Sequence, residues 1–286
     1  MPTRIIAASA LIALVGACSA TPAATTSTTA APTTTVPAAT TTPPLARCSE
    51  DFEFGEGGQI ADLTQESSDS GTIGAMSWEA AEDCETFTIA FQTSEGAPAT
   101  TPPSAQVLHL ESFQVLRVRM LGVGATVITD QLVETQLVDR IYVVRSLEGG
   151  MFIDFHLTEP TQARVEAVAS PARLILTMRP GLVPLNGFST IGERVVVTSP
   201  PAGSTVDPFL TVSGYSRTFE ANVLLIGTLG NEVVVERSTI AADWAETWGE
   251  FRSTINLPPG PVSLFVGESS AQDGALEGVT VSLTVR

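Results

Sequence analysis

Two histidines, His109 and His156, are the only imidazoles in this 286-residue sequence, so His-dependent catalysis would have to use them. Each lies in a segment that alternates like a β-strand, on the side opposite its aliphatic neighbours. We therefore expect both to face solvent or a polar interface. No nucleophile elbow, zinc-protease motif or phosphate-binding loop accompanies them. The sequence predicts no catalytic residue, no metal site and no cofactor, which leaves a hydrolase as the least favoured class.

Carboxylates gather between Ser49 and Glu56, where they could bind a hard cation such as calcium. Their spacing is not that of a calcium loop with its closing bidentate glutamate, and a solvated acidic face is the favoured interpretation. Across the chain, 31 acids oppose 14 arginines, no lysine occurs, and the net charge is −17. Nucleic acid and anionic lipid surfaces are poor partners for such a chain.

Trp244 and Trp248 are the candidate ligand-contact residues. They flank the loop-like sequence Ala-Glu-Thr and could form an aromatic platform for a sugar or for a partner protein. The alternative is structural, because Trp248 precedes a β-rich segment and could cap a hydrophobic core.

The N-terminus has the outline of a signal peptide, with Arg4 followed by an apolar run from Ile5 to Val15. The run is shorter than the roughly 20 residues of a spanning helix. Val15-Gly16-Ala17-Cys18 resembles the lipobox of bacterial lipoprotein precursors, which implies cleavage after residue 17 and a diacylated Cys18 in the bilayer. An ordinary secretory peptide cleaved near Ala20 is the alternative.

The three cysteines fit this resemblance, because a lipidated Cys18 leaves Cys48 and Cys84 as a pair in an oxidising compartment. We expect these two to form a disulfide, with two reduced thiols as the alternative. Residues 18–46 form the predicted lipidated N-terminus and tether. From residue 19 on, this stretch has eleven Thr, eight Ala and five Pro and no charge, a composition typical of disordered linkers.

Residues 47–181 predict a mainly antiparallel β domain. Residues 85–91 alternate, 106–111 and 114–120 follow as strands, and 141–144 and 151–157 form a hairpin around Gly149-Gly150. A second hairpin joins 163–169 to 173–178. Residues 131–137 are assigned as a short helix, and 78–82 fit either a helical turn or a loop.

Several of these segments together resemble the AMIN-like domain of bacterial lipoproteins. The resemblance rests on 84–93, the 140–157 hairpin, Ala163-Arg164-Val165 and the closing Ser170-Pro171-Ala172-Arg173-Leu174-Ile175-Leu176. Thr177 departs from the family, which often has an acid there. The resemblance implies attachment to the cell envelope and binding of peptidoglycan or another wall glycan, without catalysis.

Residues 182–193 have loop composition and are the predicted linker. Residues 194–286 then predict a seven-stranded immunoglobulin-like sandwich, from seven short β-rich segments separated by Gly/Pro turns. These segments are 194–198, 209–213, 222–228, 232–237, 249–255, 262–266 and 278–285. The expected core is Val195, Val197, Leu210, Val212, Val223, Leu225, Phe251, Leu264 and Val266.

This C-terminal part resembles the Gmad2 immunoglobulin-like module of spore-germination proteins. The resemblance is carried by Ser199-Pro200-Pro201-Ala202-Gly203-Ser204-Thr205-Val206, Val212-Ser213-Gly214, Phe219-Glu220-Ala221, Gly249-Glu250-Phe251 and Gln272-Asp273-Gly274. No sporulation role follows, since sandwich folds host unrelated functions.

Together these features predict a non-catalytic lipoprotein anchored through Cys18 to the outer face of the bacterial cell membrane. The first hypothesis is a module that binds peptidoglycan or another envelope glycan. The alternative is a scaffold that docks an envelope protein through its immunoglobulin-like domain.

Overall fold

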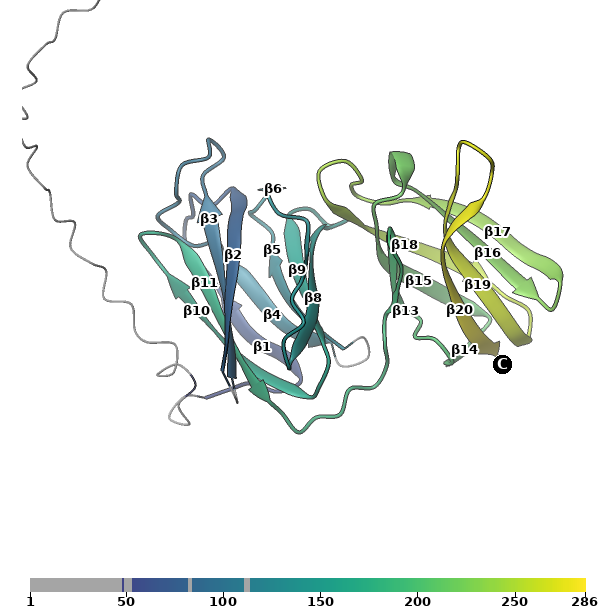
Figure 1. The fold of residues 1–286 in the computed structure, drawn as a ribbon, viewed down its shortest axis with the longest axis horizontal. Coiled ribbons are helices and arrows are strands. Elements are labelled where there is room, and N and C mark those ends of the chain that lie inside the picture. The colour runs from purple at the N-terminus through teal and green to yellow at the C-terminus, as the bar shows by residue number, and fades with distance from the viewer. Residues whose placement is uncertain (1–47, 49–52, 82–83, 111–113) are drawn as a thin grey trace, which may run out of the picture. The chain divides into compact units, whose positions relative to one another are not determined.

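β-Strands make up nearly all the regular structure of the computed structural model, which describes Cys48 and residues 53–81, 84–110 and 114–286 (Figure 1). Among these residues no α-helix occurs, and the 3-10 turn η3 (Phe219–Ala221) lies between two strands. The predicted mainly β fold class is therefore confirmed. Cys18, the signal peptide and the Thr/Ala/Pro tether lie outside the described residues.

Two facing sheets build the first module (Figure 1). One has the order β10-β11-β3-β2-β6; the other begins β1-β4-β5-β9-β8, and β7 also pairs with β8. Nearly all neighbours are antiparallel; the short β2–β6 pair is parallel. The strands are β1 (Gly58–Leu63), β2 (Thr72–Ala81), β3 (Cys84–Gln92), β4 (Ala105–Leu110), β5 (Val115–Met120), β6 (Ala125–Thr126), β7 (Asp130–Leu132), β8 (Val138–Arg145), β9 (Met151–Leu157), β10 (Thr161–Val168) and β11 (Arg173–Pro180).

Both predicted hairpins of this module are confirmed. β8 and β9 pair around a turn in which Gly149 and Gly150 have φ angles of 92° and 72°, which glycine adopts without strain. Gly150 is doubly constrained, because a Cβ there would lie 2.5 Å from the carbonyl oxygen of Met120. β10 pairs with β11 along its whole length.

The helix predicted at 131–137 is wrong. The first residues of this segment belong to β7, which pairs antiparallel with β8. The Val133 N–H, just after β7, donates to the Asp139 carbonyl at 2.8 Å. Leu132 is 58% exposed, whereas Leu137 is 1% exposed in the first core and Val133 packs against that core. Residues 78–81, left between helical turn and loop, belong to β2, where Trp78 lies opposite Phe87 and packs against the core.

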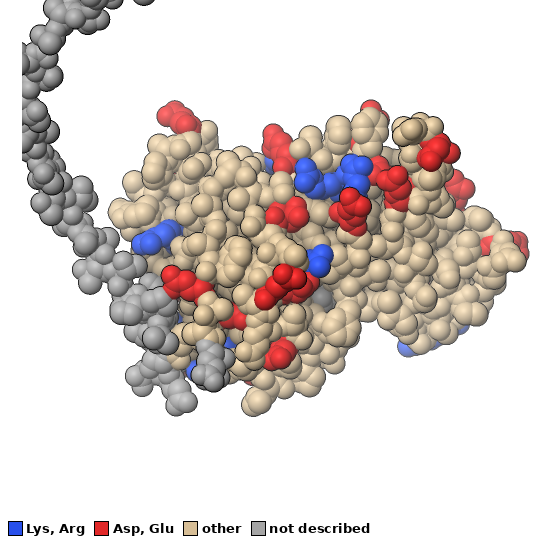
Figure 2. Space-filling model, in the orientation of Figure 1, with Lys and Arg blue, Asp and Glu red and all other residues tan. Residues whose placement is uncertain are grey.

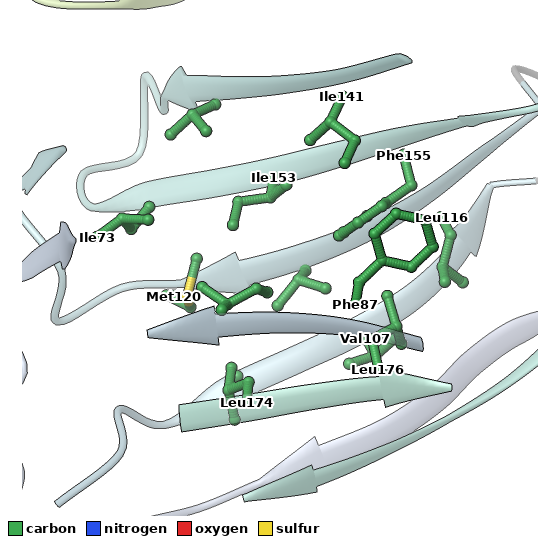
Figure 3. Close-up of a cluster of buried hydrophobic side chains, with 14 of the residues drawn as sticks. Ile73, Phe87, Val107, Leu116, Met120, Ile141, Ile153, Phe155, Leu174 and Leu176 are labelled. Atoms are coloured by element: carbon green, nitrogen blue, oxygen red, sulfur yellow. The ribbon is translucent and has the colours of Figure 1, made fainter. Parts of the chain in front are cut away.

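Apolar side chains from the facing sheets of this module fill one core (Figure 3). Phe87 of β3 and Phe155 of β9 meet edge to face at 5.1 Å between ring centroids, and both are fully buried. The alternation of each strand places these side chains inward, because successive residues point to opposite faces of a sheet. The two aromatic rings therefore join the sheets across the core.

The predicted disulfide is confirmed: Cys48 is bonded to Cys84, at the start of β3, with a Cα–Cα distance of 5.9 Å. It closes a loop across a sequence separation of 36 residues. In the chain-entropy account, such a loop constrains the unfolded chain by about 3 to 4 kcal/mol. The bond fixes the N-terminal end of the described chain to the first module.

A second sandwich follows, and each of its seven predicted strands is present. β13, β15 and β18 form one sheet, and β14-β20-β19-β16-β17 form the other. All nine predicted core residues pack in its core, with Leu210 partly buried and the rest fully buried. The strands are β12 (Thr190–Ile191), β13 (Val195–Ser199), β14 (Thr205–Val206), β15 (Phe209–Ser216), β16 (Asn222–Leu229), β17 (Glu232–Ile240), β18 (Trp248–Asn256), β19 (Gly260–Ser269) and β20 (Leu276–Val285).

The two modules share one sheet. β18 pairs in parallel with β8 through Trp248–Val144 and Gly249–Arg145, so a ten-stranded sheet continues from β1 to β12. A third buried cluster lies on one face of this sheet and contains residues of both modules: Tyr142, Val144, Phe152, Val196, Tyr215 and Trp248. The described residues of both modules accordingly belong to one compact unit.

Candidate functional site

A surface hollow of about 420 Å³ contains one of the two predicted contact residues, Trp244. Its walls are Arg145 at the end of β8, residues 220–221 before β16, and the loop 241–246 between β17 and β18. We call it the Trp244 hollow. Figure 2 shows that acidic side chains are scattered over the face in view and outnumber the arginines there.

Asp243 holds the loop that carries Trp244. Its Oδ1 accepts hydrogen bonds from the backbone N–H groups of Trp244, Ala245 and Glu246 at 2.6, 3.0 and 3.2 Å, and its Oδ2 accepts one from Arg145 Nε at 2.8 Å. Partial burial acts to raise the pKa of Asp243, but the arginine and the three N–H groups stabilise the carboxylate more, and the pKa is lowered. The loop is therefore fixed before any ligand binds.

Arg145, at the end of β8 in the first module, lines the hollow. Besides the bond to Asp243, its Nη2 contacts Glu246 Oε2 at 2.8 Å and its Nη1 donates to the Gly124 carbonyl at 2.9 Å. All three guanidinium nitrogens are thus engaged. The hollow is built from both modules, although most of its wall comes from the second.

Gly249 allows the loop to lie against β18. A Cβ at this position would lie 2.1 Å from the backbone nitrogen of Asp243 and 2.3 Å from its carbonyl oxygen. The Thr247 hydroxyl, next in the loop, donates to the Val143 carbonyl of β8 at 2.6 Å. These contacts place Trp244 on a rigid support, where recognition residues are most effective.

Trp244 lines the hollow, and its ring contacts a second aromatic side chain, that of Phe219, beside the lining. Trp244 is 38% exposed and Phe219 54% exposed, and their rings meet edge to face at 5.4 Å. The turn that presents Phe219 is unusual, because Glu220 and Ala221 both have left-handed φ angles, 54° and 59°. Non-glycine residues adopt this conformation at a cost, and clusters of such residues are common at binding sites.

A buried carboxylate fixes the Phe219 turn from below. Glu268 is 7% exposed, accepts the Phe219 N–H on Oε2 at 2.6 Å and pairs through Oε1 with Arg194 at 2.9 Å. The sequence analysis did not identify Glu268, Arg145 or Asp243. Only Asp243 had a local signal, since Asp243-x-x-Glu246 has the spacing of a capping box.

Trp248 lies away from the hollow, and the predicted two-tryptophan platform is wrong. The indole is 3% exposed in the cluster between the modules, 4.8 Å from the Tyr142 ring, and its Nε1 donates to Asp130 Oδ1 at 3.1 Å. Trp248 therefore has a structural role, as the alternative predicted, but it packs between the two modules and not on the core of one sandwich.

Both histidines are buried, so of the two expected environments, solvent and a polar interface, solvent is wrong. His109 is 3% exposed and accepts the Gly57 N–H on Nδ1 at 3.1 Å. His156 is 6% exposed, and its Nε2 contacts the Tyr215 hydroxyl of the second module. His156 does point away from the first core, as predicted, but the second module covers that face. Neither histidine lines the Trp244 hollow.

The acidic run at 49–56 is described only from residue 53. Glu56 Oε1 accepts hydrogen bonds from the backbone N–H groups of Leu182 and Val183, the latter at 2.5 Å, so this carboxylate fixes the loop after β11.

In the described residues, no group of three or more His, Cys, Asp or Glu side chains is placed to hold a metal ion. Within the same ranges, no helix has the length and apolarity to cross a membrane.

Comparison with known proteins adds one relationship. Searches of curated proteins and of solved structures give no match. A family model does match residues 194–275, which include strands β13 to β19, Phe219 and the Trp244 of the hollow. This matched family is Gmad2, the immunoglobulin-like domain of bacterial spore germination, and the second module is an immunoglobulin-like β domain similar to it.

Proposed function

We propose that the protein is a lipid-anchored, extracytoplasmic binding protein that holds a wall glycan in the Trp244 hollow. One observation carries the proposal: an exposed tryptophan is fixed, before binding, next to carboxylates at a surface hollow. An indole face packs against the apolar C–H face of a sugar ring, while carboxylates accept hydrogen bonds from its hydroxyls. The first module's resemblance to AMIN-like domains supports the same ligand class.

The anchor in this proposal is Cys18, acylated at the end of the signal peptide. Two acyl chains hold a protein stably on a bilayer, whereas one binds only marginally. Cys18→Ala should move the protein from the membrane fraction to the soluble extracytoplasmic fraction, as measured by immunoblot of the fractionated cells. A variant that stays with the membrane would contradict lipidation.

Trp244→Ala should weaken retention of the protein on purified cell-wall sacculi roughly tenfold or more, as expected for a central aromatic contact. The measurement is co-sedimentation over a range of sacculus concentrations. Phe209→Ala is the matched control, because Phe209 is 75% exposed in the same module but lies outside the hollow. Equal retention of the wild type and Trp244→Ala would exclude the hollow as the contact site.

A second candidate function is docking of an envelope protein. Its support is an apolar surface around a hollow of about 630 Å³ lined by Pro208, Val233, Pro258 and Pro259 among others. Val233 is 54% exposed, and Phe209 beside Pro208 is more exposed still. Interfaces between proteins are often built on such exposed apolar patches. If Phe209→Ala weakens binding to the envelope and Trp244→Ala does not, this function replaces wall binding.

A further inference from the structure

The Trp244 hollow presents carboxylate oxygens as hydrogen-bond acceptors, while the backbone donors of its loop are mostly used within the protein. The three nitrogens of Arg145 are engaged within the protein, as described above. The backbone N–H groups with partners inside the protein are those of Ala221, Ala241, Ala242, Trp244, Ala245 and Glu246. A ligand that donates hydrogen bonds therefore fits this hollow better than one that accepts them.

The charges of the hollow favour a cation. Three carboxylates, those of Glu220, Asp243 and Glu246, line it together with one guanidinium, which leaves two net negative charges. Asp243 and Arg145 neutralise one another inside the wall, whereas Glu246 is 65% exposed and contacts Arg145 through Oε2. Glu220 is exposed as well. Carboxylates at the entrance of a hollow attract positively charged groups.

Aromatic faces strengthen the same preference. Trp244 is part-exposed in the lining of the hollow, and the part-exposed ring of Phe219 contacts it. An ammonium over the face of an aromatic ring, tryptophan best of all, is attracted by the ring electrons. An acidic surface alone would attract any cation weakly. The combination of fixed aromatic rings, unused acceptors and net negative charge is selective for an organic amine.

We infer that the hollow selects the free-amine form of a wall glycan, in which a sugar ring carries a protonated primary amine, over the N-acetylated form. This inference rests on the proposed function and names its ligand chemistry. A protonated amine offers three donors and no acceptor. N-Acetylation removes the charge and leaves one N–H, so the acetylated form donates fewer hydrogen bonds to the carboxylates of the hollow.

The test compares two probes of equal length and linkage, the hexamer of β-1,4-linked glucosamine and the hexamer of N-acetylglucosamine. Binding to the full chain in detergent is measured by isothermal titration calorimetry. We expect the glucosamine hexamer to bind roughly tenfold more tightly, with an affinity that falls as salt is added. Equal affinities, a preference for the N-acetylated hexamer, or no binding of either would overturn the inference.

Variants of the carboxylates separate a local site from the general acidity of the protein. Glu220→Gln should weaken binding of the glucosamine hexamer roughly tenfold and leave that of the N-acetylated hexamer unchanged, since one charge near a bound cation is removed. Glu232→Gln is the matched control, an exposed glutamate on β17 beside the other hollow. Equal weakening by both variants would contradict a specific site.

The outcomes also distinguish this inference from the proposed function. A chain that sediments with sacculi but binds both hexamers alike overturns the amine preference only. A chain that binds the glucosamine hexamer but not sacculi overturns wall binding and leaves the chemistry of the hollow intact. If a lysine hexapeptide binds more tightly than the glucosamine hexamer, the partner is a basic protein and the glycan assignment is overturned.

Discussion

Asp154→Ala should lower the free energy of unfolding by about 3 to 5 kcal/mol, the usual loss when one partner of a buried ion pair is removed. Asp154 of β9 is fully buried. Its two carboxylate oxygens accept hydrogen bonds from Nε and Nη2 of Arg117 on β5, both at 2.7 Å. The guanidinium also lies over the Phe152 ring, 3.8 Å from its centroid. Without the carboxylate, Arg117 is left as a charge with no counter-ion in a poorly hydrated place.

The pair lies on the sheet face that the second module covers. Arg117, Asp154 and Tyr142 are cross-strand partners on neighbouring strands, so they share one face, and Tyr142 belongs to the cluster between the modules. Denaturant unfolding of the variant measures the effect. Asp139→Ala is the control, since Asp139 is 40% exposed in its pair with Arg140 and should cost at most about 1 kcal/mol.

A double variant separates the buried charge from lost packing. Arg117→Met combined with Asp154→Leu removes both charges and should recover most of the stability lost in Asp154→Ala, because apolar replacement of a buried pair is often close to neutral. An Asp154→Ala protein as stable as the wild type would contradict burial of the pair and, with it, the docking of the modules.

His156 should make the protein sensitive to acid. Burial, with a smaller contribution from the nearby Arg140 charge, lowers the pKa of His156 to about 3, whereas an unfolded histidine titrates near 6.5. Between these values the unfolded chain binds a proton that the folded protein does not. The contribution of the neutral imidazole is therefore complete above pH 6.5 and is lost as the pH falls toward 3, by about 1.4 kcal/mol per pH unit.

The measurement is the free energy of unfolding at pH 7 and at pH 4. His156→Phe should reduce the difference between the two by about 3 kcal/mol, even though the variant loses the contact with the Tyr215 hydroxyl. Tyr215→Phe is the matched control; it removes that hydroxyl but keeps the imidazole buried, so the difference should remain. An unchanged pH dependence in His156→Phe would show that the imidazole is accessible to water when the protein is folded.

Much of the fold could be predicted because its local patterns agree with its tertiary structure. Phe87, Ile89 and Phe91 alternate in the sequence and all point into the first core. In the second module, turn residues separate the longer strands so regularly that the sequence predicts seven of the nine; the two-residue strands β12, inside the predicted linker, and β14 have no such signal. Residues 131–137 are not helical because hydrogen bonds to β8, a non-local contact, decide their conformation.

The sequence could not predict the surroundings of His156 and Trp248 because both are buried between the modules. Alternation correctly placed His156 opposite the first core, but no periodicity within a strand reveals that Tyr215 covers it. Trp248 was misjudged for the same reason. Arg145 reaches Asp243 across 98 positions of sequence, a contact with no local signal. Trp244 was found because an aromatic residue in a polar loop is informative by itself.

The indole N–H signals of the three tryptophans provide the most direct test of wall binding through the Trp244 hollow. Trp78 packs against the first core, Trp248 is buried between the modules, and Trp244 is part-exposed at the hollow. In a two-dimensional ¹⁵N NMR titration with soluble glycan fragments released from the cell wall, we predict that the Trp244 signal shifts and that those of Trp78 and Trp248 stay in place. Binding of the fragments with an unmoved Trp244 signal would contradict the proposed site.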